Sequence, residues 1–225
     1  MSLQSLYEVA REHRSMVRVL LSAPEGAGRT HLLGTQAHVL RVDVGKGPLG
    51  AQTLRALTGA EGSDDAVLET LRATLAREEP DASRRRTAVE LLASLLGVRR
   101  PDFLTAHLDE DSRREGAVLE LARQVTYAAR DGLILAFDDA HLADDEGLAF
   151  IEFLSQREAP TPLVLLVSHD ADENRFIPSF RSRRATWLRD VRWRTLPVPA
   201  LSRARVVALL KTAGASEERA ARLAE

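Results

Sequence analysis

The feature of this 225-residue chain that most restricts its fold is an apolar run, residues 16–22, that ends at a glycine-rich turn. The run reads Met-Val-Arg-Val-Leu-Leu-Ser, and Ala-Pro and the closely spaced Gly26 and Gly28 follow it. Apolar runs of this length that end at turn residues are typical of strands buried in a parallel sheet. We expect a helix from Thr30 to Ala37 after the turn, which completes a strand–turn–helix unit.

Further segments continue this alternation. Four more strands are expected. Residues 133–137 and 163–168 are short apolar runs typical of buried strands, residues 38–44 alternate between apolar and polar, and residues 193–198 are a further candidate. Helical spacing of apolar residues is found at 3–14, 142–157 and 201–211, and through 51–130 with breaks near 59–63, 79–80 and 97–101. Strands that alternate with helices predict an α/β fold, with a parallel sheet covered on both faces.

Composition excludes several classes of protein. The chain has no cysteine, which rules out disulfides, thiolate metal sites and cysteine nucleophiles. No apolar run approaches the roughly 20 residues that cross a bilayer, and residues 1–4 do not resemble an export signal. We therefore expect a cytoplasmic protein without a membrane partner. A net charge of −2 gives no general attraction for nucleic acid, so direct nucleic-acid binding is not expected.

Residues 23–30, Ala-Pro-Glu-Gly-Ala-Gly-Arg-Thr, match most of a phosphate-binding loop. The pattern asks for Gly, four residues, Gly, Lys and then Ser or Thr, and the chain departs from it at Ala23 and Arg29. Glycines let backbone N–H groups turn inward around phosphate oxygens. The candidate nucleotide-binding residues are Glu25, Gly26, Ala27, Gly28, Arg29 and Thr30. The Thr30 hydroxyl is also a candidate ligand of Mg²⁺. The alternative is a tight glycine turn that binds no ligand.

Arg29 is the more serious departure from the pattern. The usual lysine carries a compact charge that reaches the terminal phosphates, whereas a guanidinium is wider and planar. Arg29 can still contact phosphate, but its position does not favour efficient hydrolysis. The sequence therefore leaves open whether the chain is an ATPase enzyme.

A pair of acids follows the strand expected at 133–137. In this arrangement a strand end presents one carboxylate towards Mg²⁺ and another towards an attacking water. Asp138 is the candidate metal ligand, and Asp139 is the candidate catalytic base or water-positioning residue. A solvated strand end or a helix cap is the alternative for the pair taken alone.

With these residues the chain resembles the bacterial STAND ATPases, AAA+-related P-loop proteins that include the ATPase modules of large LuxR-type regulators. Residues 138–144, Asp-Asp-Ala-His-Leu-Ala-Asp, are similar to the family signature, and residues 196–202 resemble the entry into its helical lid. The resemblance implies a P-loop nucleotide-binding domain over 1–198 and the start of a truncated lid over 199–225. It also implies ATP or ADP with Mg²⁺ as cofactors, the other domains of a longer chain as partners, and homo-oligomers.

The resemblance assigns further roles near the fourth expected strand. Ser168 is the first candidate for a polar sensor of phosphate and His169 the second, although either could make only local bonds. His169-Asp170 replaces an arginine often found at this point, which again counts against efficient hydrolysis. Residues 176–183 are similar to a Ser-Arg-Cys segment of clamp-loader ATPases, which implies an arginine finger at Arg181 or Arg183. A solvated basic face is the alternative.

Three functions follow from these features. The first, which the sequence favours, is an ATP-binding regulatory module for signal transduction or transcription regulation, in which nucleotide switches conformation with weak or absent hydrolysis. The second is a clamp-loader-like AAA+ subunit. The third is an interaction module that kept the fold and lost its nucleotide, and Ala23 and Arg29 are its best support.

Overall fold

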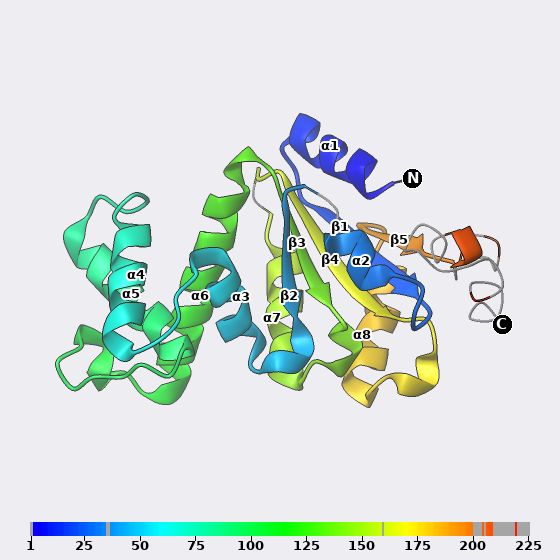
Figure 1. Ribbon diagram of the computed structural model, residues 1–225. Coiled ribbons are helices and arrows are strands. Elements are labelled where there is room, and N and C mark those ends of the chain that lie inside the picture. The colour runs from blue at the N-terminus through cyan, green and yellow to red at the C-terminus, as the bar shows by residue number, and fades with distance from the viewer. Residues whose placement is uncertain are drawn as a thin grey trace.

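A computed structural model describes residues 2–34, 37–158 and 160–199, together with 204, 206–208 and 219. Five strands form one sheet in which every neighbouring pair is parallel, in the order β2-β3-β4-β1-β5 (Figure 1). The strands are β1 (Val17–Ala23), β2 (Val39–Asp43), β3 (Leu133–Asp138), β4 (Leu163–Asp170) and β5 (Trp193–Pro197). The α/β fold with a parallel sheet, as expected for a P-loop NTPase, is confirmed.

Helices cover both faces of the sheet. Helices α1 (Leu3–His13) and α2 (Arg29–Gly34) lie on one face; α3 (Leu49–Thr58), α6 (Glu110–Ala128), α7 (Asp145–Gln156) and α8 (Pro178–Arg189) lie on the other. The central strand β4 shows how the sequence builds two cores. Val164 and Leu166 pack under α1 and α2, whereas Leu165 and Val167 face the opposite core, because successive side chains of a strand point to opposite faces.

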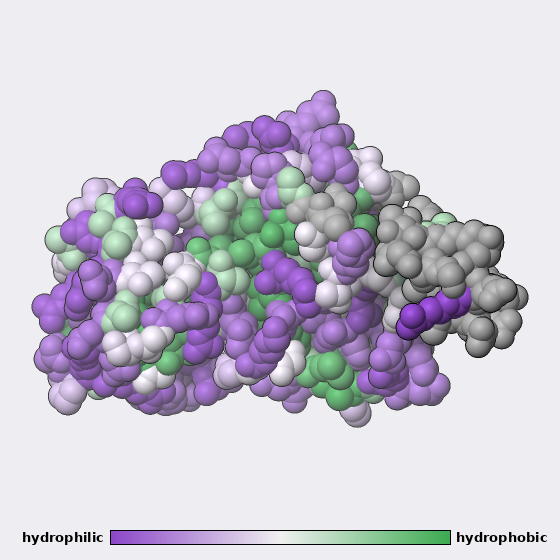
Figure 2. Space-filling model, in the orientation of Figure 1, coloured by the Kyte–Doolittle hydropathy of each residue, from purple (hydrophilic) through white to green (hydrophobic). Residues whose placement is uncertain are grey.

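Two more helices extend the domain away from the sheet. Helices α4 (Asp64–Leu75) and α5 (Ala82–Leu95) pack on each other, and α5 packs on α6, at the left in Figure 1. Each begins after an acceptor side chain: Ser63 accepts a bond from the Ala66 N–H, and Asp81 from the Arg84 N–H. Apolar residues gather over the sheet in the middle of this view, and hydrophilic residues cover α1 and the margins (Figure 2).

The structure differs from the sequence prediction at several helices. Helix α8 was not expected; its sequence carries little one-sided pattern, and only Phe180 and Trp187 are buried. Helix α7 begins at Asp145 instead of 142, after Asp144 caps it. Helix α2 is described over Arg29–Gly34, and residues 35–36 of the expected helix lie outside the described residues. The lid and the domain boundary near 198 fall largely outside the described residues. Among the described helices, none is long and apolar enough to cross a membrane.

Candidate nucleotide-binding site

The candidate site lies at the carboxyl ends of the central strands. After β1 the chain runs to β2 at one edge of the sheet, and after β4 it runs to β5 at the other edge. Ligands of open α/β sheets bind where neighbouring connections leave in opposite directions. A cleft of about 1160 Å³ lies here, slightly larger than the roughly 300–1,000 Å³ of most small-molecule pockets. Its lining comprises Pro24, Glu25, Gly26, Gly28, Arg29, Thr30, His31, Gly34, Asp139, His141, Leu142, Asp170 and Arg175.

The turn after β1 depends on its two glycines for backbone shape. Gly26 has φ 76° and Gly28 has φ 82°, in the left-handed region that side chains disfavour. A Cβ at either position would meet no atom within 4 Å, so conformation and not crowding requires glycine there. The Ala27 N–H bonds to the Pro24 carbonyl at 3.2 Å and closes the turn. The structure therefore places most of the predicted loop residues along one side of the cleft.

Asp138 is the most heavily bonded side chain of the site. It ends β3, between β2 and β4, and its side chain is only 1% exposed. Oδ1 accepts a bond from Ser168 Oγ at 2.5 Å and lies 3.3 Å from Arg29 Nε. Oδ2 accepts a bond from Thr30 Oγ1 at 2.9 Å and lies 3.1 Å from Arg41 Nε. One buried carboxylate thus ties α2, β2 and β4 to the end of β3.

Asp139 follows in a less common conformation, with φ 60° and ψ 37°. Aspartate is one of the residues that tolerate this left-handed region. The Asp139 N–H bonds to Ser168 Oγ at 3.1 Å, and the carboxylate, 39% exposed, forms an ion pair with Arg29 in the cleft. The two acids of the predicted pair therefore point in different directions: Asp138 is buried, and Asp139 is open to a ligand.

Arg29 lies between the two acids. Its guanidinium forms ion pairs with Asp138 and Asp139, and its Nη1 donates to the Ala23 carbonyl at 3.4 Å. The side chain is 12% exposed and lines the cleft. Arg29, which occupies the position of the usual lysine, thus contacts both acids of the predicted pair, although they lie far from it in the sequence.

The two sensor candidates have different surroundings. Ser168 contacts both acids, as described, whereas His169 lies beneath α8 against Phe176 and Phe180, with ring centroids 5.4 and 5.6 Å away. Burial lowers the pKa of His169 to about 4, so the ring is neutral near pH 7. Its Nδ1 bonds to the Asp170 carbonyl at 2.6 Å, and Arg184 Nε donates to its Nε2 at 3.4 Å. His169 is not among the described residues that line the cleft.

Arg175 is a cleft residue that the sequence did not indicate. It closes the short turn Glu173–Arg175, and its Nη1 lies 2.5 Å from both Glu25 Oε2 and Asp170 Oδ2. The bridge connects the phosphate loop to the end of β4. Burial would raise the pKa of Asp170, but bonds from the Asp172 N–H and Arg175 outweigh it and lower that pKa. Nothing in the sequence distinguishes Arg175 from the other arginines of residues 175–205.

Two more residues near the acid pair lack a role from the sequence: His141 lines the cleft, and Arg41 lies behind it. His141 is buried, and burial lowers its pKa although Asp139, whose Oδ1 lies 4.0 Å from its Nδ1, acts in the opposite sense. Arg41, on β2, was not singled out either; it forms ion pairs with Asp43 as well as with Asp138. Its only signal in the sequence is a charge near the end of an expected strand.

The arginine-finger candidates lie outside this cleft. Arg181 Nη2 donates to the Glu173 carbonyl at 2.9 Å, and Arg183 Nε bonds to Glu152 Oε2 at 3.1 Å. Both lie on α8, and neither is among the described lining residues. Contact with a nucleotide of a neighbouring subunit stays a prediction.

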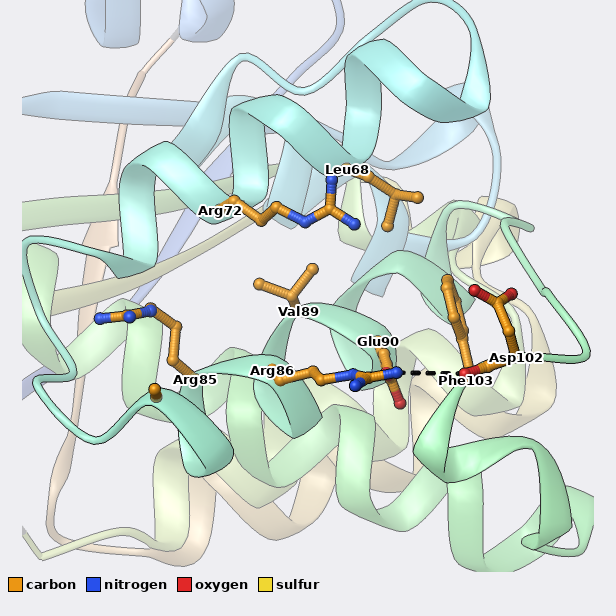
Figure 3. Close-up of a pocket in the computed structure, with 9 residues that line it drawn as sticks. Leu68, Arg72, Arg85, Arg86, Val89, Glu90, Asp102 and Phe103 are labelled. Atoms are coloured by element: carbon orange, nitrogen blue, oxygen red, sulfur yellow. Dashed lines mark hydrogen bonds and ion pairs between the residues drawn. The ribbon is translucent and has the colours of Figure 1, made fainter.

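A second pocket, of about 290 Å³, lies between α4 and α5 (Figure 3), near the small end of known ligand sites. Arg72, Arg85 and Arg86 line it, but Figure 3 shows their guanidinium groups pointing in different directions. Arg85 bonds to the Glu79 carbonyl at 2.9 Å, and Arg86 to Glu90 at 3.0 Å. The arginines do not converge on one point, so this pocket is not a second phosphate site.

Asp138, the acid expected to hold Mg²⁺, does not fit that ion as it is arranged. Its side chain is only 1% exposed, and the guanidinium groups of Arg29 and Arg41 already lie against its carboxylate. Mg²⁺ needs oxygen ligands in near-octahedral geometry. Within the described part of the chain, no group of three or more His, Asp or Glu side chains is placed to hold a metal ion.

Comparison with known proteins gives the family of the chain. A search of curated proteins finds no match. Residues 2–167 match the family model of the AAA ATPase domain, over the phosphate loop, the acid pair and most of β4. That segment contains β1, β2, β3, most of β4 and most of the residues that line the cleft. The chain therefore belongs to the AAA ATPase domain family and is an AAA+-related P-loop module.

Proposed function

We propose that this chain is an ATP-binding regulatory module in which nucleotide acts as a conformational switch, with weak or absent hydrolysis. Membership of the AAA ATPase domain family supports a nucleotide-binding module. The observation that carries the finer proposal is the contact of Arg29 with both Asp138 and Asp139. The residue at the lysine position is paired with the two acids that a hydrolytic site would use.

The same contact supplies a two-state element. A phosphate group that enters the cleft competes with Asp139 for Arg29, since a guanidinium binds phosphate and carboxylate oxygens with the same fork of N–H groups. Arg175 offers a second exchange, from Glu25 and Asp170 to phosphate. Each exchange releases a carboxylate that was held in the nucleotide-free arrangement. A ligand that favours one arrangement shifts the population of the other.

The proposed switch would couple the cleft to the surface. Arg175 belongs to the turn that leads into α8, and α8 carries arginines on its exposed side. Movement of Arg175 towards phosphate would therefore change how the start of α8 is held. Other domains of a longer chain, or another copy of this chain, are the proposed readers of that change.

The experiment is calorimetric titration of the chain with ATP and with ADP. We expect binding, weakened by Arg29→Ala and unchanged by Arg189→Ala, an exposed arginine of α8 outside the cleft lining. Absence of binding at millimolar nucleotide would overturn the proposal and favour a nucleotide-free interaction module. A steady-state turnover near the enzyme median of about 10 s⁻¹ would overturn weak hydrolysis. Nucleotide-dependent assembly that requires Arg181 or Arg183 would instead favour the clamp-loader-like alternative.

A further inference from the structure

We propose that the cleft binds its nucleotide without a divalent cation, because arginine side chains supply the positive charge that Mg²⁺ would bring. Arg29 and Arg175 would face the phosphate groups, and Arg41 would keep Asp138 compensated so that it is not a metal ligand. This inference rests on the proposed function, in which the cleft binds nucleotide.

Asp138 is already surrounded by donors and cations of the chain. Its side chain is only 1% exposed, and it accepts hydrogen bonds from Ser168 Oγ at Oδ1 and from Thr30 Oγ1 at Oδ2. Two guanidinium nitrogens form ion pairs with the same carboxylate: Arg29 Nε lies 3.3 Å from Oδ1, and Arg41 Nε lies 3.1 Å from Oδ2. A metal ion bound directly to Asp138 would have to displace a charged guanidinium from it. The charge of Asp138 is therefore already compensated within the chain.

The ion-pair network around Asp138 is electrically neutral. Its linked ion pairs connect three basic side chains with three acidic ones, so the formal charges sum to zero. The members are Arg29, Arg41, Lys46, Asp43, Asp138 and Asp139. A divalent cation binds where carboxylates lack a counter-charge. The network described here has no excess negative charge to offer.

Arg29 and Arg41 have different roles at Asp138. Arg29 lines the cleft, whereas Arg41 does not appear in the described lining and approaches Asp138 from β2. When phosphate draws Arg29 away, Asp138 keeps Arg41, Thr30 and Ser168. The metal position stays closed in the nucleotide-bound state, and Arg41 is the residue that closes it.

Two arginines of the cleft supply positive charge to the ligand. Arg175 lines the cleft together with Arg29. A guanidinium stays protonated at any physiological pH and presents planar, paired donors that match phosphate geometry. Two such groups can neutralise the terminal phosphates of ADP or ATP, which is the binding role that Mg²⁺ fills elsewhere.

The test is calorimetric titration of the whole chain with ADP and ATP, in EDTA and in excess Mg²⁺. We expect dissociation constants within about threefold of each other in the two conditions. Arg41→Gln removes the compensating charge, and binding should then become about tenfold tighter with Mg²⁺ than with EDTA. Arg189→Gln is the matched control and should behave as the wild type.

A second measurement does not depend on any variant. Mn²⁺ added to wild-type chain with ADP should enhance water proton relaxation no more than Mn²⁺ with ADP alone. An enhancement that requires the protein, or wild-type binding at least about tenfold tighter with Mg²⁺, would overturn the inference and leave the proposed function standing. No binding in either condition would overturn the proposed function and the inference with it.

Discussion

Arg29 forms an ion pair with Asp139, which lies 110 residues further along the chain. The pair joins the phosphate loop to the acid pair at the end of β3, in a cleft that a nucleotide would have to enter. Because Arg29 also contacts Asp138, a single guanidinium holds both acids. This arrangement leads to predictions about turnover, stability and pH dependence.

Two substitutions together should restore more hydrolysis than either alone. Arg29→Lys returns the compact charge that phosphate transfer uses, and Arg41→Gln opens Asp138 to a metal ion. We expect the fold-increase of the double variant in steady-state phosphate release with Mg²⁺ to exceed the product of the two single-variant increases, because both changes act on one carboxylate. Arg189→Gln serves as the control; a fold-increase equal to that product would show that Arg29 and Arg41 act independently.

Asp138→Asn should destabilise the fold more than Asp139→Asn. The buried Asp138 accepts two hydrogen bonds and forms two ion pairs, and loss of its charge leaves Arg29 and Arg41 without their shared partner. We expect a loss of about 2 kcal/mol in the free energy of unfolding, compared with under about 1 kcal/mol for the half-exposed Asp139. Urea unfolding followed by circular dichroism measures both. Equal losses would contradict the structural difference between the acids.

Stability should fall as the pH drops below 6.5. The pKa of His169 is lowered from 6.5 to about 4 by burial, so the unfolded chain binds the proton more readily than the folded one between these values. The neutral ring stabilises the fold above the unfolded pKa, and that contribution is lost on acidification. From pH 7.5 to 5 we expect a loss of about 2 kcal/mol from this group, measured by urea unfolding.

The control for this pH dependence is His169→Gln, which removes the titrating ring. The variant should be less stable at pH 7.5, because Gln fits the space against Phe176 and Phe180 less well. The difference in stability between pH 7.5 and 5 should shrink in the variant. His141, whose pKa is also lowered by burial, acts in the same sense and should account for part of the remainder. An unchanged pH dependence would contradict the assignment to His169.

Gly28→Ala should weaken both folding and nucleotide binding. Its φ of 82° strains any residue with a Cβ, although no neighbouring atom would clash. We expect a stability loss of about 1 kcal/mol and a higher dissociation constant for ATP by calorimetry. Gly45→Ala is the matched control, because that position is equally open and its φ is not positive. Similar losses in both variants would show that the turn does not require left-handed backbone.

Arg175→Ala should reduce affinity for ATP without loss of the fold. The side chain is 46% exposed and bridges Glu25 to Asp170 across the cleft. We expect the dissociation constant to rise about tenfold, with an unchanged circular dichroism spectrum, if phosphate takes the place of the two carboxylates. Arg189→Ala should leave the affinity unchanged. Tighter binding by Arg175→Ala would indicate that the bridge obstructs the ligand.

Sequence patterns were sufficient for the elements that depend on local order. Apolar runs and alternation predicted strands at all five places, and the glycine spacing identified the turn at Gly26 and Gly28. These features are visible because burial on a sheet and left-handed backbone each restrict which residues a position accepts. Helix α8 was not predicted from the sequence, because it buries few side chains and its sequence therefore carries little apolar periodicity.

Residue order by itself determined that a glycine turn follows the first strand and that two acids follow the third, because strands and turns are specified by neighbouring residues. Only the tertiary structure decided which cations reach those acids. Arg41 meets Asp138 because β2 lies beside β3, and Arg175 meets Glu25 because the end of β4 lies beside that of β1. Arginine is frequent in this chain, and an ion pair is selected by strand order and distance, neither of which a local pattern contains.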